Sequence, residues 1–242
     1  PSVFRIFSMK TVYSSSASSV PYQPVFAPDN SEIKTAIETI AGVRTNFIVN
    51  ISAGTPNDQH GDIRRVLEAA GDNKELFIVA AGNSGENPDN DRSELYPANY
   101  GGRGATDMPL ITVGGYTDYP TNNAAEVGIW EKSNYGSHVD ILALGCDVQT
   151  VKFEDNNARN FVSLDYDKGT SLAAPRVTFV AAVIKHLLSH RQNIDNAKNV
   201  PMAIKNRILS AADLHPALED YVVDGRVLNL AKAVNLFSDL VE

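Results

Sequence analysis

A serine among small residues at the start of a long apolar helix is the feature that most constrains this chain of 242 residues. The segment Gly169–Arg176 is followed by apolar positions at helical spacing, at Val177, Val180, Ile184 and Leu187. Backbone N–H groups at a helix N-terminus have no intrahelical partners, and the helix dipole is positive there. A hydroxyl at Ser171 is therefore placed to attack a carbonyl carbon while the helix end stabilises the oxyanion. An ordinary N-cap serine is the structural alternative.

This segment resembles the serine motif of the subtilisin-like serine peptidases, in which Gly-Thr-Ser precedes small residues and Ala-Pro. Further segments resemble the same family in the same order: Phe47–Gly54, Leu76–Gly85, Tyr96–Tyr100, Ile111–Gly115, Ser133–Gly145 and Asp224–Asn229. One departure is Ala143-Leu144-Gly145, where the family usually has Ala-Pro-Gly. The resemblance implies an α/β fold with a doubly wound, mostly parallel sheet flanked by helices. It implies one domain over residues 1–242, with the N-terminal part of the family's fold missing.

The pattern of apolar and turn-forming residues predicts the same architecture without the resemblance. Strands are expected near 3–12, 46–52, 76–81, 110–114 and 139–143, and a hairpin across 148–165. Helices are expected near 31–41, 60–71, 171–190, 200–212 and 228–238. Strands that alternate with helices favour a parallel sheet covered by helices on both faces.

The resemblance also implies roles for residues around Ser171. Ser171 would be the nucleophile, and the side-chain amide of Asn83 would donate to the oxyanion. Without the resemblance, Asn83 reads as an asparagine tolerated in a tight turn. The backbone of Ser52, Ala53 and Gly54 would pair with the substrate as an added strand, and Ala81 and Gly82 would also bind it.

Leu95 precedes the Tyr96-Pro97 pair, a position that in the family faces the bottom of the pocket for the side chain before the cleaved bond. A branched side chain there would fill much of the pocket, so the resemblance predicts a preference for small residues on the acyl side. The alternative is that the stretch 101–108 reshapes the neighbourhood and turns Leu95 away.

The base and the acid of a serine peptidase are not evident in this chain. A serine hydroxyl needs a positioned base, and that base needs an orienting acid. In the family both precede the cleft strand, in an Asp-x-Gly turn and a His-Gly-Thr-His helix, and neither motif occurs before Phe47. Residues 1–46 hold no histidine and one aspartate, Asp29. We therefore expect the His and Asp to come from a preceding segment of the same precursor, in the same chain or as a second chain.

None of the five histidines is a credible substitute for that base. His60 begins the helix expected near 60–71, where the family has a covering helix, so a solvated helix-start residue is the simpler interpretation. The other four lie in loops or at the far end of the Ser171 helix: His138, His186, His190 and His215. His186 is over about 20 Å from Ser171 along that helix, at about 1.5 Å per residue.

The composition argues against three features: a nucleic-acid partner, an intrachain disulfide and a membrane span. Lys and Arg total 21 against 29 Asp and Glu, a net charge of −8 that argues against nucleic acid. Cys146 is the single cysteine, so no intrachain disulfide can form. Arg176 and Lys185 interrupt the most apolar helix, so no membrane span is expected.

No cofactor is required for the expected chemistry. The resemblance allows structural calcium, but no ligand set is identifiable, and a solvated acidic loop is the simpler interpretation of Asp89, Asn90 and Asp91. The resemblance favours a secreted or periplasmic location. No signal within the chain supports that location.

The leading interpretation is the serine-bearing portion of a subtilisin-like endopeptidase that hydrolyses peptides or proteins through an acyl-enzyme. The alternative is a catalytically inactive relative that binds peptides or a partner through its cleft, which explains the missing base without a further segment. A lipase-like esterase is disfavoured, because its serine lies in a Gly-x-Ser-x-Gly elbow that this sequence lacks.

Overall fold

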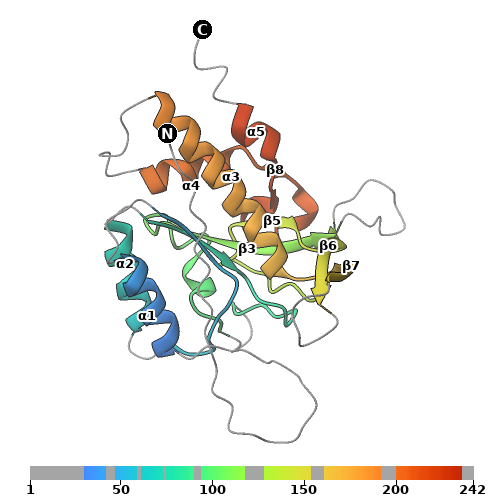
Figure 1. Cartoon of the computed structure of the whole chain (residues 1–242), viewed down its shortest axis with the longest axis horizontal. Coiled ribbons are helices and arrows are strands. Elements are labelled where there is room, and N and C mark those ends of the chain that lie inside the picture. The colour runs from blue at the N-terminus through green and yellow to red at the C-terminus, as the bar shows by residue number, and fades with distance from the viewer. Residues whose placement is uncertain are drawn as a thin grey trace, which may run out of the picture.

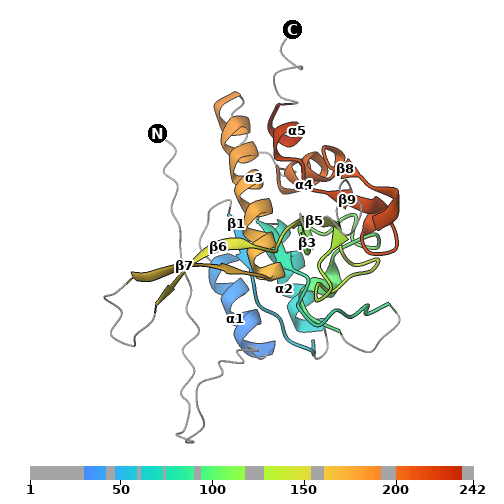
Figure 2. The same cartoon turned by 90° about the vertical axis from the view of Figure 1, so that its right-hand side faces the viewer.

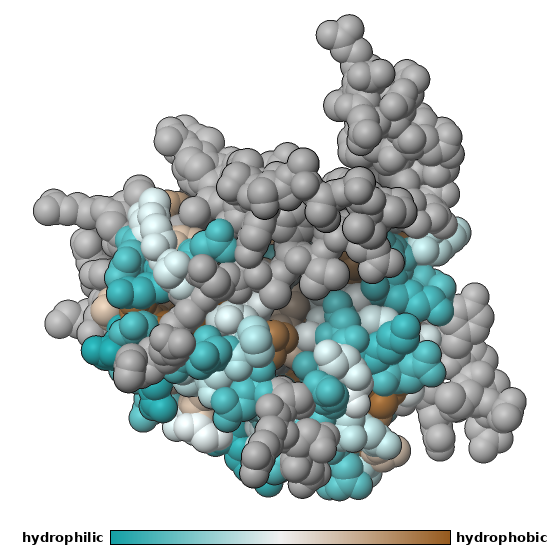
Figure 3. Space-filling view, turned by 90° about the horizontal axis from the view of Figure 1, so that it is seen from below, coloured by the Kyte–Doolittle hydropathy of each residue, from teal (hydrophilic) through white to brown (hydrophobic). Residues whose placement is uncertain are grey.

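The fold has three layers, with a central sheet between two groups of helices (Figures 1 and 2). The computed structural model describes residues 30–41, 47–58, 61–72, 75–89, 94–117, 128–153, 161–191 and 200–235. On the face shown in Figure 3 the described surface is mainly hydrophilic, with small hydrophobic areas between the polar side chains. The apolar residues of the strands lie in the core between the layers.

The centre of the sheet is parallel. Strands β1 (Ile48–Ile51), β2 (Leu76–Ala80), β3 (Leu110–Thr117) and β5 (Ile141–Leu144) lie side by side in that order. Each is a short apolar run, as expected for strands that are buried on both faces of a parallel sheet. Two short strands, β9 (Arg226–Val227) and β8 (Asp213–Leu214), extend the sheet beyond β5, and β4 (Gly128–Ile129) pairs with the end of β3.

Alternate side chains of the strands bury two separate cores. On one face, Phe77 and Val79 pack with apolar residues of helices α1 (Asn30–Ala41) and α2 (Asp62–Asp72). On the other face, Leu76 and Ile78 pack with helices α3 (Thr170–Arg191) and α4 (Val200–Ser210), and with Ala233 of α5 (Leu230–Asn235). Burying an apolar side chain of this size stabilises a fold by about 1.5–3 kcal/mol, so both groups of helices are held firmly on the sheet.

The remaining elements lie at the ends of the sheet. Strands β6 (Val148–Phe153) and β7 (Phe161–Asp167) form a separate antiparallel hairpin that leads directly into α3. Short 3-10 helices cover Ala98–Tyr100, Pro216–Leu218 and Val223–Gly225.

The architecture expected from the sequence is confirmed, since the sheet is mostly parallel and flanked by helices on both faces. The helices and strands expected between residues 31 and 212 are present with shifted ends. The two-residue strands β4, β8 and β9 were not expected, because their pairing with distant segments defines them and their own sequence pattern does not. The strand expected near 3–12 lies outside the described residues.

Helix α3 corrects one expectation. By length and composition alone, Thr170–Ser189 is apolar enough to cross a membrane despite Arg176 and Lys185. Core helices of globular proteins pass the same test, and α3 packs along β1, β2, β3 and β5 as well as α4 and α5. We therefore interpret α3 as the central core helix of this fold.

Candidate active site

Ser171 lies in the first turn of α3, where backbone N–H groups have no intrahelical acceptors. Its side chain is partly exposed, whereas Ala173 and Ala174 just behind it are fully buried against the sheet. The loop before α3 is tied to the end of β5, because the Gly169 N–H donates to the carbonyl of Gly145 at 2.8 Å. The serine is thus exposed on a helix whose next turn is fixed in the core.

Asn83, in the turn after β2, lies beside Ser171. Its Oδ1 accepts hydrogen bonds from the backbone N–H of Thr170 at 2.9 Å and from Thr170 Oγ1 at 2.8 Å. A Cβ placed on Gly169 would lie 3.0 Å from Ser171 Oγ and 3.7 Å from Asn83 Nδ2, so both groups border the same small space. A hydroxyl and an amide donor on one space are two of the groups that acyl transfer requires, and a base for the hydroxyl is the third.

Thr170 helps to position Asn83, a role that was not predicted from the sequence. Its side chain is fully buried, and its hydroxyl accepts from the Gly82 N–H at 3.1 Å while donating to Asn83 Oδ1. The backbone N–H of Thr170 can only donate, so the atom of Asn83 that it meets must be the oxygen, and Nδ2 is left for a ligand. The sequence signal was the threonine directly before Ser171, with no sign of its partner 87 residues away.

The two segments expected to line the substrate both reach this point. Ser52 and Ala53 are exposed at the end of β1, and Ser52 Oγ donates to the carbonyl oxygen of Ser171 at 3.3 Å. Gly82 is partly exposed at the end of β2. Ala81 differs from the others, because its side chain is buried in the core with Val139 and Leu142, which leaves only its backbone for substrate.

Leu95 lies between these two segments. A Cβ on Gly54 would lie 2.7 Å from Leu95 Cγ, and a Cβ on Gly82 would lie 2.7 Å from Leu95 Cδ2. The two glycines therefore create a slot that the leucine side chain occupies. Backbone hydrogen bonds between Thr55 and Tyr96, at 2.9 and 2.7 Å, hold the two loops in this register.

Leu95 faces Gly54 and Gly82, so the stretch 101–108 does not turn its side chain away from them. This stretch is itself held to α4. A buried lysine, Lys205 of α4, donates to the carbonyls of Ala105 at 2.9 Å and Met108 at 3.1 Å. Asp140 lies 3.9 Å from that ammonium group and accepts the N–H of Gly102 at 3.0 Å. Burial raises the pKa of Asp140 and lowers the pKa of Lys205.

No histidine among the described residues is hydrogen-bonded to Ser171. His138 is buried, and burial lowers its pKa to about 4. His186 belongs to the far part of α3, and His215 precedes the 3-10 helix at Pro216–Leu218. His60, and the side chain of His190, lie outside the described residues.

Metal binding gains no support from the part of the chain that the structure describes, where no three His, Cys, Asp or Glu side chains cluster. Asp89 binds Ser137 instead, with hydrogen bonds of 2.6 Å from the backbone N–H and 2.7 Å from Oγ. Asn90 and Asp91 lie outside the described residues.

Cys146 is buried, and burial raises the pKa of its thiol.

Glu75 stands apart from this site, directly before β2 and so at the opposite end of that strand from Asn83. Its side chain is fully buried, and neither carboxylate oxygen has a hydrogen-bond partner among the described residues. Burial raises the pKa of Glu75 to about 7, and the charge of Lys185 opposes this rise only in part.

Residues 17–230 match the subtilase family of peptidases. The sequence is 29% identical to M-protease of Shouchella clausii over 177 residues, which is 72% of this chain and 40% of that protein. It is 27% identical to the A-subunit of the subtilase cytotoxin of Escherichia coli over 200 residues, which is 78% of this chain and 53% of that protein. The chain therefore spans about half of these relatives or less.

Solved structures show the same fold. The A-subunit of the AB5 toxin from E. coli superposes with a TM-score of 0.68 at 25% identity, over 86% of this chain and 66% of that one. A cold-adapted subtilisin-like serine proteinase superposes with a TM-score of 0.57 at 21% identity, over 84% of this chain and 60% of that one.

Proposed function

Because the chain belongs to the subtilase family, whose members are serine endopeptidases, we propose that it is the serine-bearing portion of a subtilisin-like endopeptidase. The observation that supports this most directly is the placement of Ser171 Oγ and Asn83 Nδ2 around one space beside Gly169. The substrate is a peptide or protein segment that adds as a strand along Ser52–Gly54.

The proposed reaction runs through an acyl-enzyme. Ser171 Oγ attacks the scissile carbonyl carbon, and the carbonyl oxygen becomes an oxyanion held by Asn83 Nδ2 and the backbone N–H of Ser171. The C–N bond breaks as the leaving amine takes a proton, and water then attacks the ester and frees Ser171. A histidine base and an aspartate must move and orient these protons, and no cofactor is needed.

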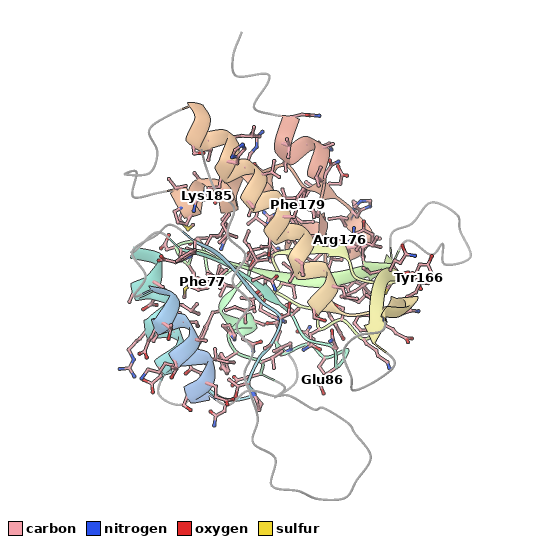
Figure 4. The ribbon with its side chains drawn as sticks, in the orientation of Figure 1. Phe77, Glu86, Tyr166, Arg176, Phe179 and Lys185 are labelled. Carbon is pink, nitrogen blue, oxygen red and sulfur yellow. The ribbon has the colours of Figure 1, made fainter. Side chains whose placement is uncertain are left out.

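We place the source of that histidine and aspartate in a preceding segment of the same protein. The chain covers 66% of the AB5 toxin protein, so a third of that fold has no counterpart here. Among the described strands β1 lies at the edge of the sheet, with β2 on one side only. Next to it, α3 exposes Phe179 at 60% of its surface beside Arg176 (Figure 4).

This face is suited to a strand that pairs with β1 and a helix that packs on Phe179. Asn50 of β1 and Thr178 of α3 already bridge the two elements, with 3.0 Å between Asn50 Oδ1 and Thr178 Oγ1. The main support for a docked segment is the outer side of β1, which has no strand partner among the described strands, since such an edge is a template for pairing with another strand. A segment bound there would lie directly beside Ser171, where the base is needed.

The test is hydrolysis by the protein expressed together with the residues encoded before Pro1. We expect cleavage of a casein or peptide substrate that is abolished by Ser171→Ala, and labelling of Ser171 by a fluorophosphonate probe. Absence of both cleavage and labelling, with the peptide still bound, would support the alternative instead. That alternative is a peptide-binding relative without activity, and it is favoured by the lack of any histidine bonded to Ser171 in the described residues.

The proposed location is outside the cytoplasm. One relative, 29% identical over 138 residues, is an alkaline extracellular protease of Yarrowia lipolytica. Structural calcium stays a family-based proposal.

A further inference from the structure

The turn that carries Asn83 is held by a buried asparagine from a distant segment. Asn134 is 3% exposed, and its Oδ1 accepts two backbone hydrogen bonds from this turn. The N–H of Ser84 donates at 3.0 Å and the N–H of Glu86 donates at 3.2 Å. One side-chain oxygen thus replaces the two acceptors that the turn cannot find in its own backbone.

Three backbone hydrogen bonds join the same two segments. The N–H of Asn134 donates to the carbonyl of Gly82 at 3.0 Å, so the asparagine holds both neighbours of Asn83. The N–H of Gly85 donates to Lys132, and the N–H of Tyr135 donates to Glu86, at 2.9 and 3.0 Å. The turn from Gly82 to Glu86 therefore makes five hydrogen bonds to residues 132–135.

The glycines of the turn allow this close approach. Gly82 has a φ of 105°, and a Cβ there would lie 2.5 Å from Asn134 Nδ2. Gly85 has a φ of 70°, and a Cβ there would lie 2.7 Å from the carbonyl oxygen of Glu131. A side chain at either position would push the turn away from Asn134, since such contacts are shorter than real Cβ atoms allow.

Asn134 is in turn fixed to the central sheet. The hydroxyl of the neighbouring Ser133 accepts the N–H of Gly115 in β3 at 2.9 Å and donates to the carbonyl of Asn134 at 2.9 Å. The N–H of Ser133 donates to the carbonyl of Trp130 at 2.8 Å. The turn 82–86 is therefore held by β3 as well as by β2, to which it is joined directly in the chain.

We propose that Asn134 is a positioning residue that sets the turn 82–86 and so presents the Asn83 amide to the oxyanion; the catalytic part of this proposal rests on the proposed function. Thr170 fixes which way the Asn83 amide faces, and Asn134 fixes where its backbone lies. An oxyanion donor acts only when its position is set before the reaction. Without the Asn134 carboxamide, the Ser84 and Glu86 N–H groups would lose their acceptor, and the turn would relax toward water.

The experiment uses the protein with its preceding segment and compares Asn134→Ala, Asn134→Asp and a matched control, Asn87→Ala. Asn87 is also buried, and its Oδ1 also accepts a backbone N–H, that of Asp89 at 2.9 Å. We expect Asn134→Ala to lower kcat about 10- to 100-fold, with KM changed less than about 3-fold. Asn134→Asp keeps an acceptor oxygen and should recover most of kcat, while Asn87→Ala should leave kcat near that of the parent.

A second readout does not depend on catalysis. In the Ser171→Ala background, Asn134→Ala should speed amide hydrogen exchange at Ser84 and Glu86 at least about 10-fold, with β2 and β3 unchanged. Unchanged exchange at these two amides would overturn the proposal, as would equal loss of kcat in Asn134→Ala and Asn87→Ala. A parent without Ser171-dependent hydrolysis would refute the proposed function, and the exchange result would still decide whether Asn134 holds the turn.

Discussion

The surroundings of Ser171 differ between its two sides: one is fixed by hydrogen bonds, and the other has a strand edge that no described strand pairs with and an exposed aromatic side chain. On the side of Asn83, hydrogen bonds through Thr170 and Asn134 join three segments that are distant in the sequence. On the other side, β1 is an edge among the described strands and α3 exposes Phe179. The first side suits the proposed oxyanion site, and the second suits the segment that we propose supplies the base.

This difference separates two requirements of one reaction. Stabilising an oxyanion needs donors that are fixed in advance, and in the proposed function the Asn83 amide, held in place through Thr170 and Asn134, is such a donor. Activating the serine needs a base at its hydroxyl, and the described residues provide no such group. Variants that disturb one side should therefore show whether the other side responds.

The largest effect is expected from removing the preceding segment. Residues 1–242 alone should hydrolyse peptides at least about 10⁴-fold more slowly than the protein with that segment, since loss of catalytic residues in subtilisin has effects of this size or larger. Steady-state kcat/KM with a chromogenic peptide measures this, and Ser171→Ala gives the background. Rapid Ser171-dependent turnover by residues 1–242 would place the base within this chain. It would contradict the proposal that a preceding segment supplies the base.

On the completed side, Asn83→Ala should lower kcat about 10²- to 10³-fold, the range known for an oxyanion donor in subtilisin. KM should change little, because the amide meets the oxyanion and not the bound ground state. Active-site titration with a fluorophosphonate controls for misfolded protein. A variant with parental kcat would remove Asn83 from the oxyanion site.

Leu95→Gly should change which peptides are cleaved. Opening the slot between Gly54 and Gly82 should raise kcat/KM for Phe relative to Ala before the scissile bond by about 10- to 100-fold, or about 1–3 kcal/mol. A peptide library profiled on the parent and the variant gives this ratio. Equal cleavage after Phe and Ala by both proteins would rule out Leu95 as the floor of the pocket.

Thr170→Val should have a smaller effect, about 10-fold on kcat, because it removes one donor to Asn83 Oδ1 and the acceptor of the Gly82 N–H. The backbone N–H of Thr170 still holds Asn83 Oδ1. Thr170→Ser keeps the hydroxyl and is the matched control. If valine and serine behave alike, the hydroxyl contributes nothing to the placement of Asn83.

The smallest effect on activity is expected from Glu75→Gln, at the opposite end of β2 from Asn83. Burial raises the pKa of folded Glu75 to about 7 from an ordinary value of 4.5, so the folded state is penalised as pH rises through this window. The variant should gain about 1–3 kcal/mol in free energy of unfolding at pH 8 and little at pH 4. Urea unfolding at both values measures this, and a gain that is equal at both would contradict the assignment.

Sequence reasoning predicted the central strands because each is a short apolar run, a pattern that burial on both faces imposes. It also selected Ser171, Asn83 and Leu95, whose arrangement in one place agrees with their expected roles without testing them. It missed Thr170 and Asn134, since their partners lie 88 and 50 residues away and hydrogen bonds at such separations leave no periodic signal. The burial of Ala81 agrees with its place at the end of the apolar run 76–81, and the sequence did not show that Val139 and Leu142 would be its core neighbours.

The helix that carries Ser171, the proposed nucleophile, is also the centre of one hydrophobic core. Ala173, Ala174 and Val177 follow Ser171 within two turns, and none of them is exposed. Ser171 is therefore expected to lose its position when the core itself unfolds, whereas a catalytic residue on a surface loop can lose its position by local unfolding. Thermal loss of nucleophile reactivity should follow the same curve as the melting of the core, and mutations that protect the core against heat should protect the serine equally.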